Sequence, residues 1–196
     1  PESLKSFALT VGISKRENVI DVSLLEFCVR AHLNEEAPRA MAVLDPLKIS
    51  IINYNDNKEE SVNFDINPQK PGQGKREILF SRNIYIERED FQENPEEGFF
   101  RLSLGEEVRL KNAYIIKAKN IIKNEKGQIT EVECEYDEKS KSGSNTEESN
   151  RKVKATIHWV SAETAVEATI NIYDRLFKVA EPGKSQDLLS EVNESS

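Results

Sequence analysis

The sequence predicts a mainly β fold of one or two barrels, preceded by a short helical subdomain. Three observations lead to this prediction. Residues 1–36 place apolar side chains at helical spacing. After residue 41, several short segments alternate apolar and polar side chains, as half-buried strands do. Segments rich in Pro, Gly, Asn and Ser separate these strands and are typical of turns and loops.

The helical segment is expected to end just before Pro38. Ser23 and Glu26 have the spacing of a capping box, which marks the start of a helix. The apolar residues that follow at helical spacing are Leu24, Leu25, Cys28, Val29 and Leu33. The residue before a proline avoids the helical region of backbone space, so Ala37 is expected to be extended.

A hairpin gives the clearest strand signal. Residues 114–123 and 128–137 are strand-like and flank a turn at 124–127. In the second arm, apolar residues alternate with glutamates, which predicts a strand with one buried face; these apolar residues are Val132, Cys134 and Tyr136. Further strands are expected at residues 84–86, 153–159 and 166–172, and a mobile Ser-rich loop is expected at 139–151.

Length and charge limit the functions that this chain can have. Its 196 residues could form one large domain or two small ones. The formal net charge is −8. A protein that coats nucleic acid non-specifically would be basic, because that affinity comes from neutralising phosphates. If this chain binds nucleic acid, we therefore expect a local basic patch on an acidic body. The two cysteines make no disulfide framework and indicate a reducing cytoplasm, and no apolar run is long enough to span a membrane.

The sequence predicts no catalytic residue, no metal site and no cofactor in this chain. His32 and His158 have no cysteine or carboxylate at metal-ligand spacing. Both are expected to have ordinary structural or surface roles. The adjacent acids Glu89 and Asp90 are expected to lie on a solvated surface. There is no Walker-type phosphate loop.

Basic side chains suggest recognition of an anionic ligand instead. Arg109 and Lys111 are two residues apart and would project from one face of a strand, with Arg101 on the other side of a turn at Gly105. Arg39 lies where the helix gives way to a strand. Arginine can pair with two acceptors on a base edge, and RNA-binding proteins commonly read unstacked loop bases in this way.

Further cations could hold phosphates. They are Lys70, Lys75 and Arg76 in a turn-rich loop that begins at Pro68 and Gln69, and Lys117 and Lys119 in the hairpin. The alternative is that these cations pair with the abundant acids. Cross-strand ion pairs within the hairpin would use Lys117, Lys119 and Lys123 in this way.

Several segments of this chain resemble the C-terminal half of glutaminyl-tRNA synthetases, in the same order and at similar spacing. They are residues 37–43, 45–46, 67–71, 101–114, 152–154, 157–162 and 173–177. The resemblance extends over about residues 1–180. It implies two β-barrels related to ribosomal protein L25. The implied division is the end of a helical subdomain (1–36), the first part of a proximal barrel (37–95), a distal barrel (96–160) and a truncated return to the proximal barrel (161–196).

The resemblance also implies roles for residues. Arg39 would contact the middle anticodon base, Arg101 the third base and Arg109 the first. Pro68, Gln69 and Lys111 would complete the anticodon-binding set, although Lys111 stands where the family can carry Arg and so lacks the planar fork.

The implied parent is a monomeric, cytoplasmic ligase that joins glutamine to tRNA-Gln with ATP and Mg²⁺. Its catalytic domain would lie upstream in the same polypeptide. The alternatives left open are a related glutamyl-tRNA synthetase, an L25-type ribosomal RNA-binding protein, and a module that binds no RNA.

Overall fold

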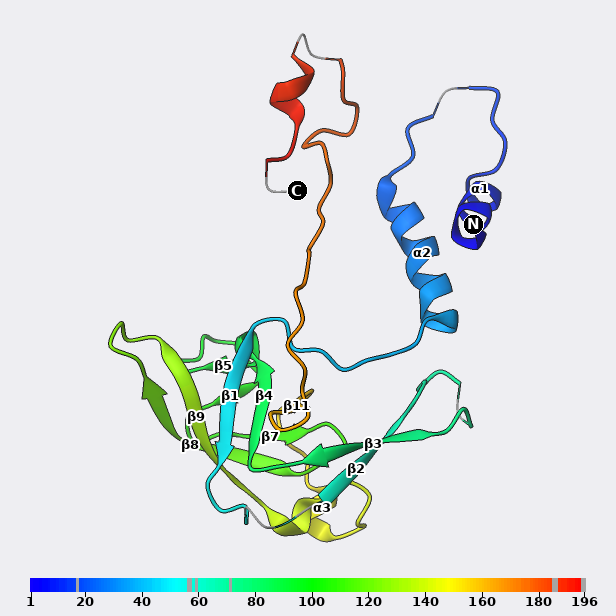
Figure 1. Cartoon of the computed structure of the whole chain (residues 1–196). Helices are drawn as coiled ribbons and strands as arrows, with labels where there is room; N and C mark the ends of the chain where they lie inside the picture. The colour runs from blue at the N-terminus through cyan, green and yellow to red at the C-terminus, as the bar shows by residue number, and fades with distance from the viewer. Residues whose placement is uncertain (17, 56–57, 59, 71, 185–186, 195–196) are drawn as a thin grey trace. The chain divides into compact units, whose positions relative to one another are not determined.

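The chain forms two compact units, residues 1–38 with 168–196, and residues 39–167. The computed structural model describes residues 1–16, 18–55, 58, 60–70, 72–184 and 187–194. The first unit holds the helices α1 and α2, and the second holds a strongly curved β-sheet (Figure 1). The prediction of a mainly β protein that begins with helices is confirmed. Among the described residues, no helix is both long and apolar enough to cross a membrane.

Two helices replace the single helical segment expected at the N-terminus. They are α1 (Glu2–Val11) and α2 (Val22–Glu36). The prediction of a capping box at Ser23 was wrong. Asp21 is the N-cap of α2, and its carboxylate accepts a hydrogen bond of 2.8 Å from the backbone amide of Ser23. A carboxylate is favoured at this end of a helix by the helix dipole. Helix α2 ends at an extended Ala37 (ψ 138°), as the following proline predicts.

The main sheet has seven strands in the order β10-β7-β8-β9-β1-β4-β11. Neighbouring strands are antiparallel, except that β1 pairs with β9 and β7 with β10 in parallel. The strands are β1 (Pro46–Ile51), β4 (Asn83–Glu87), β7 (Glu107–Leu110), β8 (Ile115–Lys123), β9 (Ile129–Tyr136), β10 (Thr156–Ile157) and β11 (Val160–Ser161).

Two smaller strand pairs and three short helical turns are the other elements described in the second unit. The pairs are the antiparallel hairpin of β2 (Glu60–Asp65) with β3 (Lys75–Phe80), and the parallel pair of β5 (Phe91–Gln92) with β6 (Leu102–Ser103). The helical turns that matter for the site are η1 (Arg88–Asp90), η2 (Glu138–Ser140) and α3 (Glu147–Asn150), while η3 (Leu188–Glu191) belongs to the first unit.

The two edges of the main sheet come close together. Strands β10 and β11 lie at opposite ends of the strand order, yet only His158 and Trp159 separate them in the chain. Three residues of extended chain span at most about 11 Å, so the sheet must curl until its edges almost meet. This also explains why the strand expected at 153–159 is short and interrupted, since the chain leaves one edge of the sheet and joins the other.

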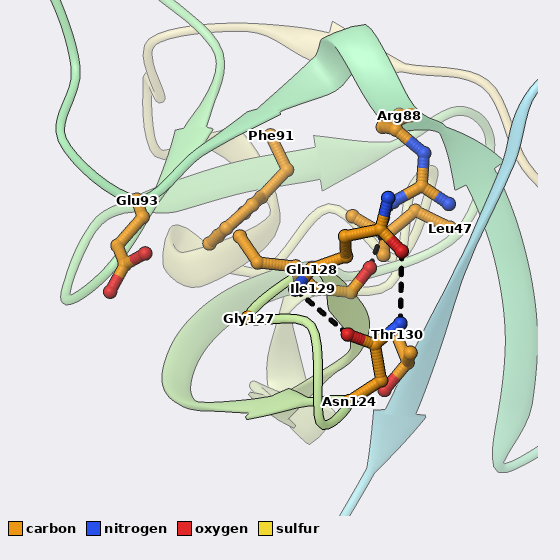
Figure 2. Close-up of a pocket in the computed structure, with 9 residues that line it drawn as sticks. All are labelled: Leu47, Arg88, Phe91, Glu93, Asn124, Gly127, Gln128, Ile129 and Thr130. Atoms are coloured by element: carbon orange, nitrogen blue, oxygen red, sulfur yellow. Dashed lines mark hydrogen bonds between the residues drawn. The ribbon is translucent and has the colours of Figure 1, made fainter.

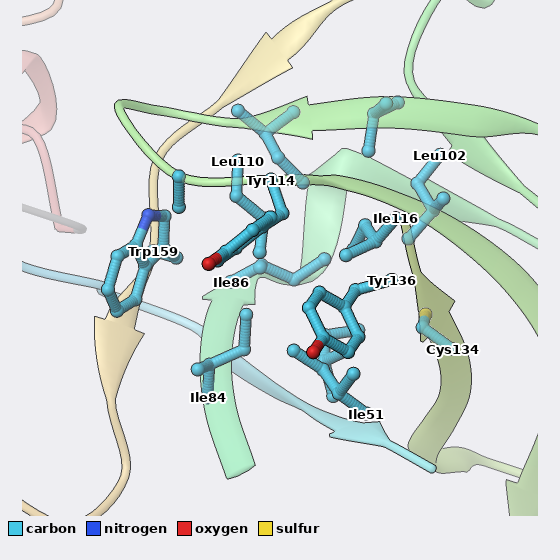
Figure 3. Packing of buried hydrophobic residues seen from close by; sticks show 14 of the residues in the cluster. Ile51, Ile84, Ile86, Leu102, Leu110, Tyr114, Ile116, Cys134, Tyr136 and Trp159 are labelled. Atoms are coloured by element: carbon cyan, nitrogen blue, oxygen red, sulfur yellow. The ribbon is translucent and has the colours of Figure 1, made fainter. Parts of the chain in front are cut away.

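Trp159 fills the space between these edges. It is fully buried among the other hydrophobic side chains of the core (Figure 3). Its indole nitrogen donates a hydrogen bond of 3.0 Å to the carbonyl oxygen of Lys111. Its ring meets that of Phe80 edge to face at 5.2 Å. Side chains from the sheet and from the β2–β3 hairpin form one core around it.

The hairpin predicted at residues 114–137 is confirmed as β8 and β9. The alternating side chains Val132, Cys134 and Tyr136 are buried, with exposed fractions of 0%, 0% and 9%. The strand predicted at 166–172 is wrong. These residues belong to no strand, and Val166 and Ile172 are 89% and 77% exposed. The segment expected to be a mobile loop at 139–151 is folded, with Ser140 fully buried.

Candidate nucleic-acid interface

The side chain of Arg39 contacts the turn-rich loop at residues 67–76, a contact that the sequence alone does not reveal. Its Nη2 donates a hydrogen bond of 3.4 Å to the amide oxygen of Gln69, which is 30 residues away. The side chain of the buried Asn67 accepts a hydrogen bond from the backbone amide of Gln69 at 3.0 Å, and so orders the loop around Pro68. The structure therefore brings three of the predicted anticodon-binding residues together.

Arg76 stabilises this cluster through a hydrogen bond to the backbone of Arg39. The residue was predicted to hold a phosphate, but its Nη1 donates a hydrogen bond of 2.6 Å to the carbonyl oxygen of Arg39. Its Nε is buried and has no hydrogen-bond partner among the described residues. Arg76 thus fixes the backbone at Arg39. Of the other cations of this loop, Lys70 is half-buried and Lys75 is exposed at the start of β3.

The irregular segment between Arg39 and β1 is anchored by Glu87 and His158. The Glu87 carboxylate accepts hydrogen bonds from the backbone amides of Leu44 (2.8 Å) and Asp45 (3.1 Å). A ring nitrogen of His158 lies 3.0 Å from the carbonyl oxygen of Ala42. His158 therefore joins the strand-edge crossing to the segment that follows Arg39, which is a structural role.

Arg101 is held by two carboxylates. Its Nη1 contacts one oxygen of Asp90 and lies 3.4 Å from the carboxylate of Glu89. Asp90 was expected on a solvated surface, and this was wrong, because the residue is only 4% exposed. Both acids lie in the tight turn η1 and face the same arginine nitrogen, but the Asp90 side chain is buried and that of Glu89 is exposed. Burial raises the pKa of the Asp90 carboxyl, while the positive charge of Arg101 opposes that shift.

Arg109 is held by backbone carbonyls instead of carboxylates. Its two terminal nitrogens donate to the carbonyl oxygens of Ser140 (3.0 Å) and Ser149 (2.8 Å), with longer contacts of 3.4 Å to Ser142 and Arg151. Burial, and then the charge of Arg151, lowers the pKa of Arg109. The guanidinium group thus closes segment 140–151 around itself through these carbonyl oxygens.

Lys111 does not share a strand face with Arg109. Strand β7 ends at Leu110, and Lys111 is exposed in the turn that follows. The turn requires a left-handed residue, Asn112 (φ 59°), whose side chain donates a hydrogen bond of 3.0 Å to the carbonyl oxygen of Asn63 in β2. The reverse face of β7 is apolar, since Val108 and Leu110 are fully buried.

The lysines of the β8–β9 hairpin lie next to acidic side chains, and two of them form ion pairs. Lys119 lies at a bulge of β8 and forms an ion pair of 2.6 Å with Glu135 across the hairpin. Lys123 pairs with Glu93, also at 2.6 Å. Lys117 lies opposite Glu107 on one side and Glu135 on the other. For Lys119, the structure therefore contains the cross-strand ion pair that was the alternative to phosphate binding.

A separate pocket is lined by none of the residues predicted to bind the anticodon or a phosphate. It has a volume of about 660 Å³ and is lined by Leu47, Arg88, Phe91, Glu93, Asn124, Gly127, Gln128, Ile129 and Thr130 (Figure 2). The guanidinium group of Arg88 is engaged at all three nitrogens, by the Asp45 carboxylate and by the carbonyls of Ile129 and Pro46. The described residues contain no cluster of acids, cysteines and histidines that could hold a metal ion.

Comparison of the sequence with known protein families identifies the family of this chain. Residues 37–137 match the family of tRNA synthetases class I (E and Q), anti-codon binding domain, and residues 156–196 match a second family model of the same description. The chain belongs to this family. The curved sheet, the turn-rich loop and the three arginines all lie within the matched anticodon-binding domain.

Close relatives are glutamine–tRNA ligases. The chain is 48% identical over 194 residues to the glutamine–tRNA ligase of Aliivibrio fischeri (strain MJ11). The match covers 99% of this chain and 35% of that ligase. The chain is 50% identical over 187 residues to the glutamine–tRNA ligase of Rhodopirellula baltica, and this match covers 95% of the chain and 31% of that ligase. The chain therefore spans about a third of the length of these relatives. The resemblance found from the sequence is confirmed.

One group of the anticodon-binding domain escaped sequence reasoning altogether. The hydroxyl of Tyr114 donates to both carboxylate oxygens of Glu60, at 2.7 and 2.8 Å, and Lys141 contacts the same carboxylate. Glu60 is 54 residues from Tyr114 and 81 from Lys141 in the chain, so no local spacing could reveal the group. It ties the segment around Arg109 to β2.

Proposed function

We propose that this chain is the anticodon-binding part of a glutamine–tRNA ligase and that it binds the anticodon loop of tRNA-Gln. The observation that carries the proposal is that Arg39, Arg101 and Arg109 are each held in place by a different partner. An amide holds the first, carboxylates the second and backbone carbonyls the third. Arginine forks that are positioned before the ligand arrives are suited to reading base edges.

In this proposal each arginine reads one base. Arg39, with Gln69 and Pro68 beside it, contacts the middle base, Arg101 the third base and Arg109 the first. Lys111 joins this set from its exposed turn. Lys70, Lys75 and Lys117 hold phosphates. Arg76 and Lys119, which the sequence also suggested for phosphates, must exchange their present partners to do so. Arg109 must likewise release a carbonyl oxygen to donate to a base, because both of its terminal nitrogens are engaged.

The parent enzyme in this proposal joins glutamine to tRNA-Gln with ATP and Mg²⁺, in a catalytic domain encoded upstream of this chain. The relatives that share about half of the sequence bear the name of that enzyme, which favours it over a glutamyl enzyme or a ribosomal protein. A monomer in the cytoplasm is the expected form.

The barrel assignment remains part of the proposal. The near-meeting of the sheet edges at Trp159 supports an L25-like barrel for residues 39–167. Strands β1 and β4 of the range 37–95 share one sheet with β7–β9 of the range 96–160, so this barrel draws on both ranges. The return to a proximal barrel at 161–196 stays a prediction.

Binding of short RNAs tests the function directly. The 196-residue chain would be titrated into fluorescently labelled anticodon stem-loops of tRNA-Gln and tRNA-Glu, an unrelated hairpin and a 5S rRNA helix, all at one salt concentration. We expect the tRNA-Gln stem-loop to bind tightest, by about tenfold or more over the unrelated hairpin, because base contacts add to phosphate attraction. Equal affinity for all four RNAs would refute the proposal. Preference for tRNA-Glu or for 5S rRNA would establish one of the two alternatives.

A further inference from the structure

We propose that Asp90 is a positioning residue, which fixes the guanidinium group of Arg101 so that its free edge faces a nucleobase. The inference rests on the proposed function, because it concerns how the third anticodon base is read. It assigns a role in specificity to a buried acid that touches no RNA itself.

The backbone places Asp90 and Arg101 side by side. Strands β5 and β6 are parallel, and Phe91 is paired in register with Leu102. Asp90 and Arg101 are the residues immediately before this pair. Both paired residues are buried, Leu102 fully and Phe91 to 6% exposure, so the core fixes the strand ends from which the two charged side chains start.

Burial makes the contact between the two side chains selective. The side chain of Asp90 is 5% exposed, whereas that of Arg101 is 46% exposed. A carboxylate taken out of water is stable only if it is paired, so Asp90 favours the one arrangement in which Arg101 reaches it. The outer part of Arg101 stays in contact with solvent, where a ligand could meet it.

The contact also leaves the useful edge of the fork available. Both carboxylate contacts of Arg101 use Nη1. Among the described residues, Nε and Nη2 make no hydrogen bond. Because the guanidinium group is planar, holding Nη1 sets the orientation of the two remaining nitrogens. Two donors on one edge match the paired acceptors of a base edge.

Glu89 provides a matched control within the same turn. It lies 3.4 Å from the same nitrogen, but its side chain is 78% exposed. Ion pairs between exposed side chains are screened by water and contribute little. If the effect came from negative charge near Arg101 in general, both acids would matter. If it comes from positioning, only Asp90 will.

The test compares five variants of the chain with the unchanged protein: Asp90→Asn, Asp90→Glu, Glu89→Gln, Arg101→Lys, and the double variant D90N/R101K. Affinity is measured for the anticodon stem-loop of tRNA-Gln and for the same RNA with the third anticodon base changed. The ratio of the two affinities reports discrimination, which a general loss of stability does not alter selectively. Circular dichroism confirms folding, and Asp90→Glu keeps the charge should Asp90→Asn fail to fold.

We expect Asp90→Asn and Asp90→Glu each to reduce discrimination at the third base by about tenfold, the size of effect that one paired contact provides. Glu89→Gln is expected to stay within about twofold of the unchanged protein. Arg101→Lys should also lose discrimination, and adding Asp90→Asn to it should have no further effect, because Asp90 acts only through the fork.

The outcomes separate this inference from the proposed function. If Arg101→Lys loses discrimination but the two Asp90 variants keep it, positioning by Asp90 is wrong and the role of Arg101 stands. If Arg101→Lys keeps discrimination, Arg101 does not read the third base, and the inference fails together with that assignment. A loss in Glu89→Gln equal to that in Asp90→Asn would show that charge matters and position does not.

Discussion

Replacing Trp159 with Phe should loosen the closure of the curved sheet. Trp159 is fully buried between β10 and β11, and its indole nitrogen donates to the carbonyl oxygen of Lys111. Phe keeps an aromatic ring but loses this donor, and a partly buried acceptor left without a partner costs about 1 kcal/mol. The smaller ring also leaves space beside Phe80, which adds roughly 1 kcal/mol. The free energy of unfolding should therefore fall by about 2 kcal/mol.

Urea unfolding followed by far-ultraviolet circular dichroism measures this change. Tryptophan fluorescence is unsuitable, because Trp159 is the only tryptophan of the chain. The exposed aromatic residue Phe100 provides a control, and Phe100→Leu should change the free energy of unfolding by less than about 0.5 kcal/mol. If Trp159→Phe is as mild as the control, the two sheet edges are not fastened by this side chain and the reasoning fails.

Three further predictions concern binding and pH. Arg109→Ala should weaken binding of the tRNA-Gln stem-loop by about 1–3 kcal/mol and relax discrimination at the first anticodon base, measured with RNAs changed at each base in turn; equal loss at all three bases would argue against it. Lys75→Ala should weaken all RNAs alike and lower the slope of log affinity against log salt by about one, in titrations over a salt series; an effect limited to one sequence would be contrary. Burial raises the pKa of Glu60, but hydrogen bonds from Lys141, Tyr114 and Lys58 outweigh burial and leave that pKa below its usual value. Glu60→Gln should therefore destabilise the fold at neutral pH, and the difference in urea midpoint should shrink as the pH falls through the lowered pKa of the folded state; a difference that is constant with pH would contradict this.

Local patterns predicted local structure well. The hairpin of β8 and β9 follows from alternation on each side of a short turn, and both signals lie within a few residues of each other. The end of α2 follows from Pro38 in the same way. The strand predicted at 166–172 shows the limit of alternation. A strand also needs a neighbour to pair with, and the sequence of one segment does not say whether a neighbour exists.

The environment of each arginine could not be predicted, because its partners are distant in sequence. Arg76 donates to a carbonyl 37 residues away, and Arg109 to carbonyls 31 and 40 residues away. The sequence indicated which residue types could read bases. It could not tell that Arg76 supports another arginine, or that Asp90 is buried while its neighbour Glu89 is exposed.

The way in which the cations are held explains how an acidic chain could select one RNA. With a net charge of −8, long-range attraction to phosphates is weak, so loose binding to any RNA is disfavoured. Several cations are already neutralised by neighbouring acids, among them Lys119 and Lys123. What remains for recognition is geometry. An arginine whose charge is balanced by a buried carboxylate, as at Arg101, gains little from a passing phosphate but can still offer two oriented donors to the correct base.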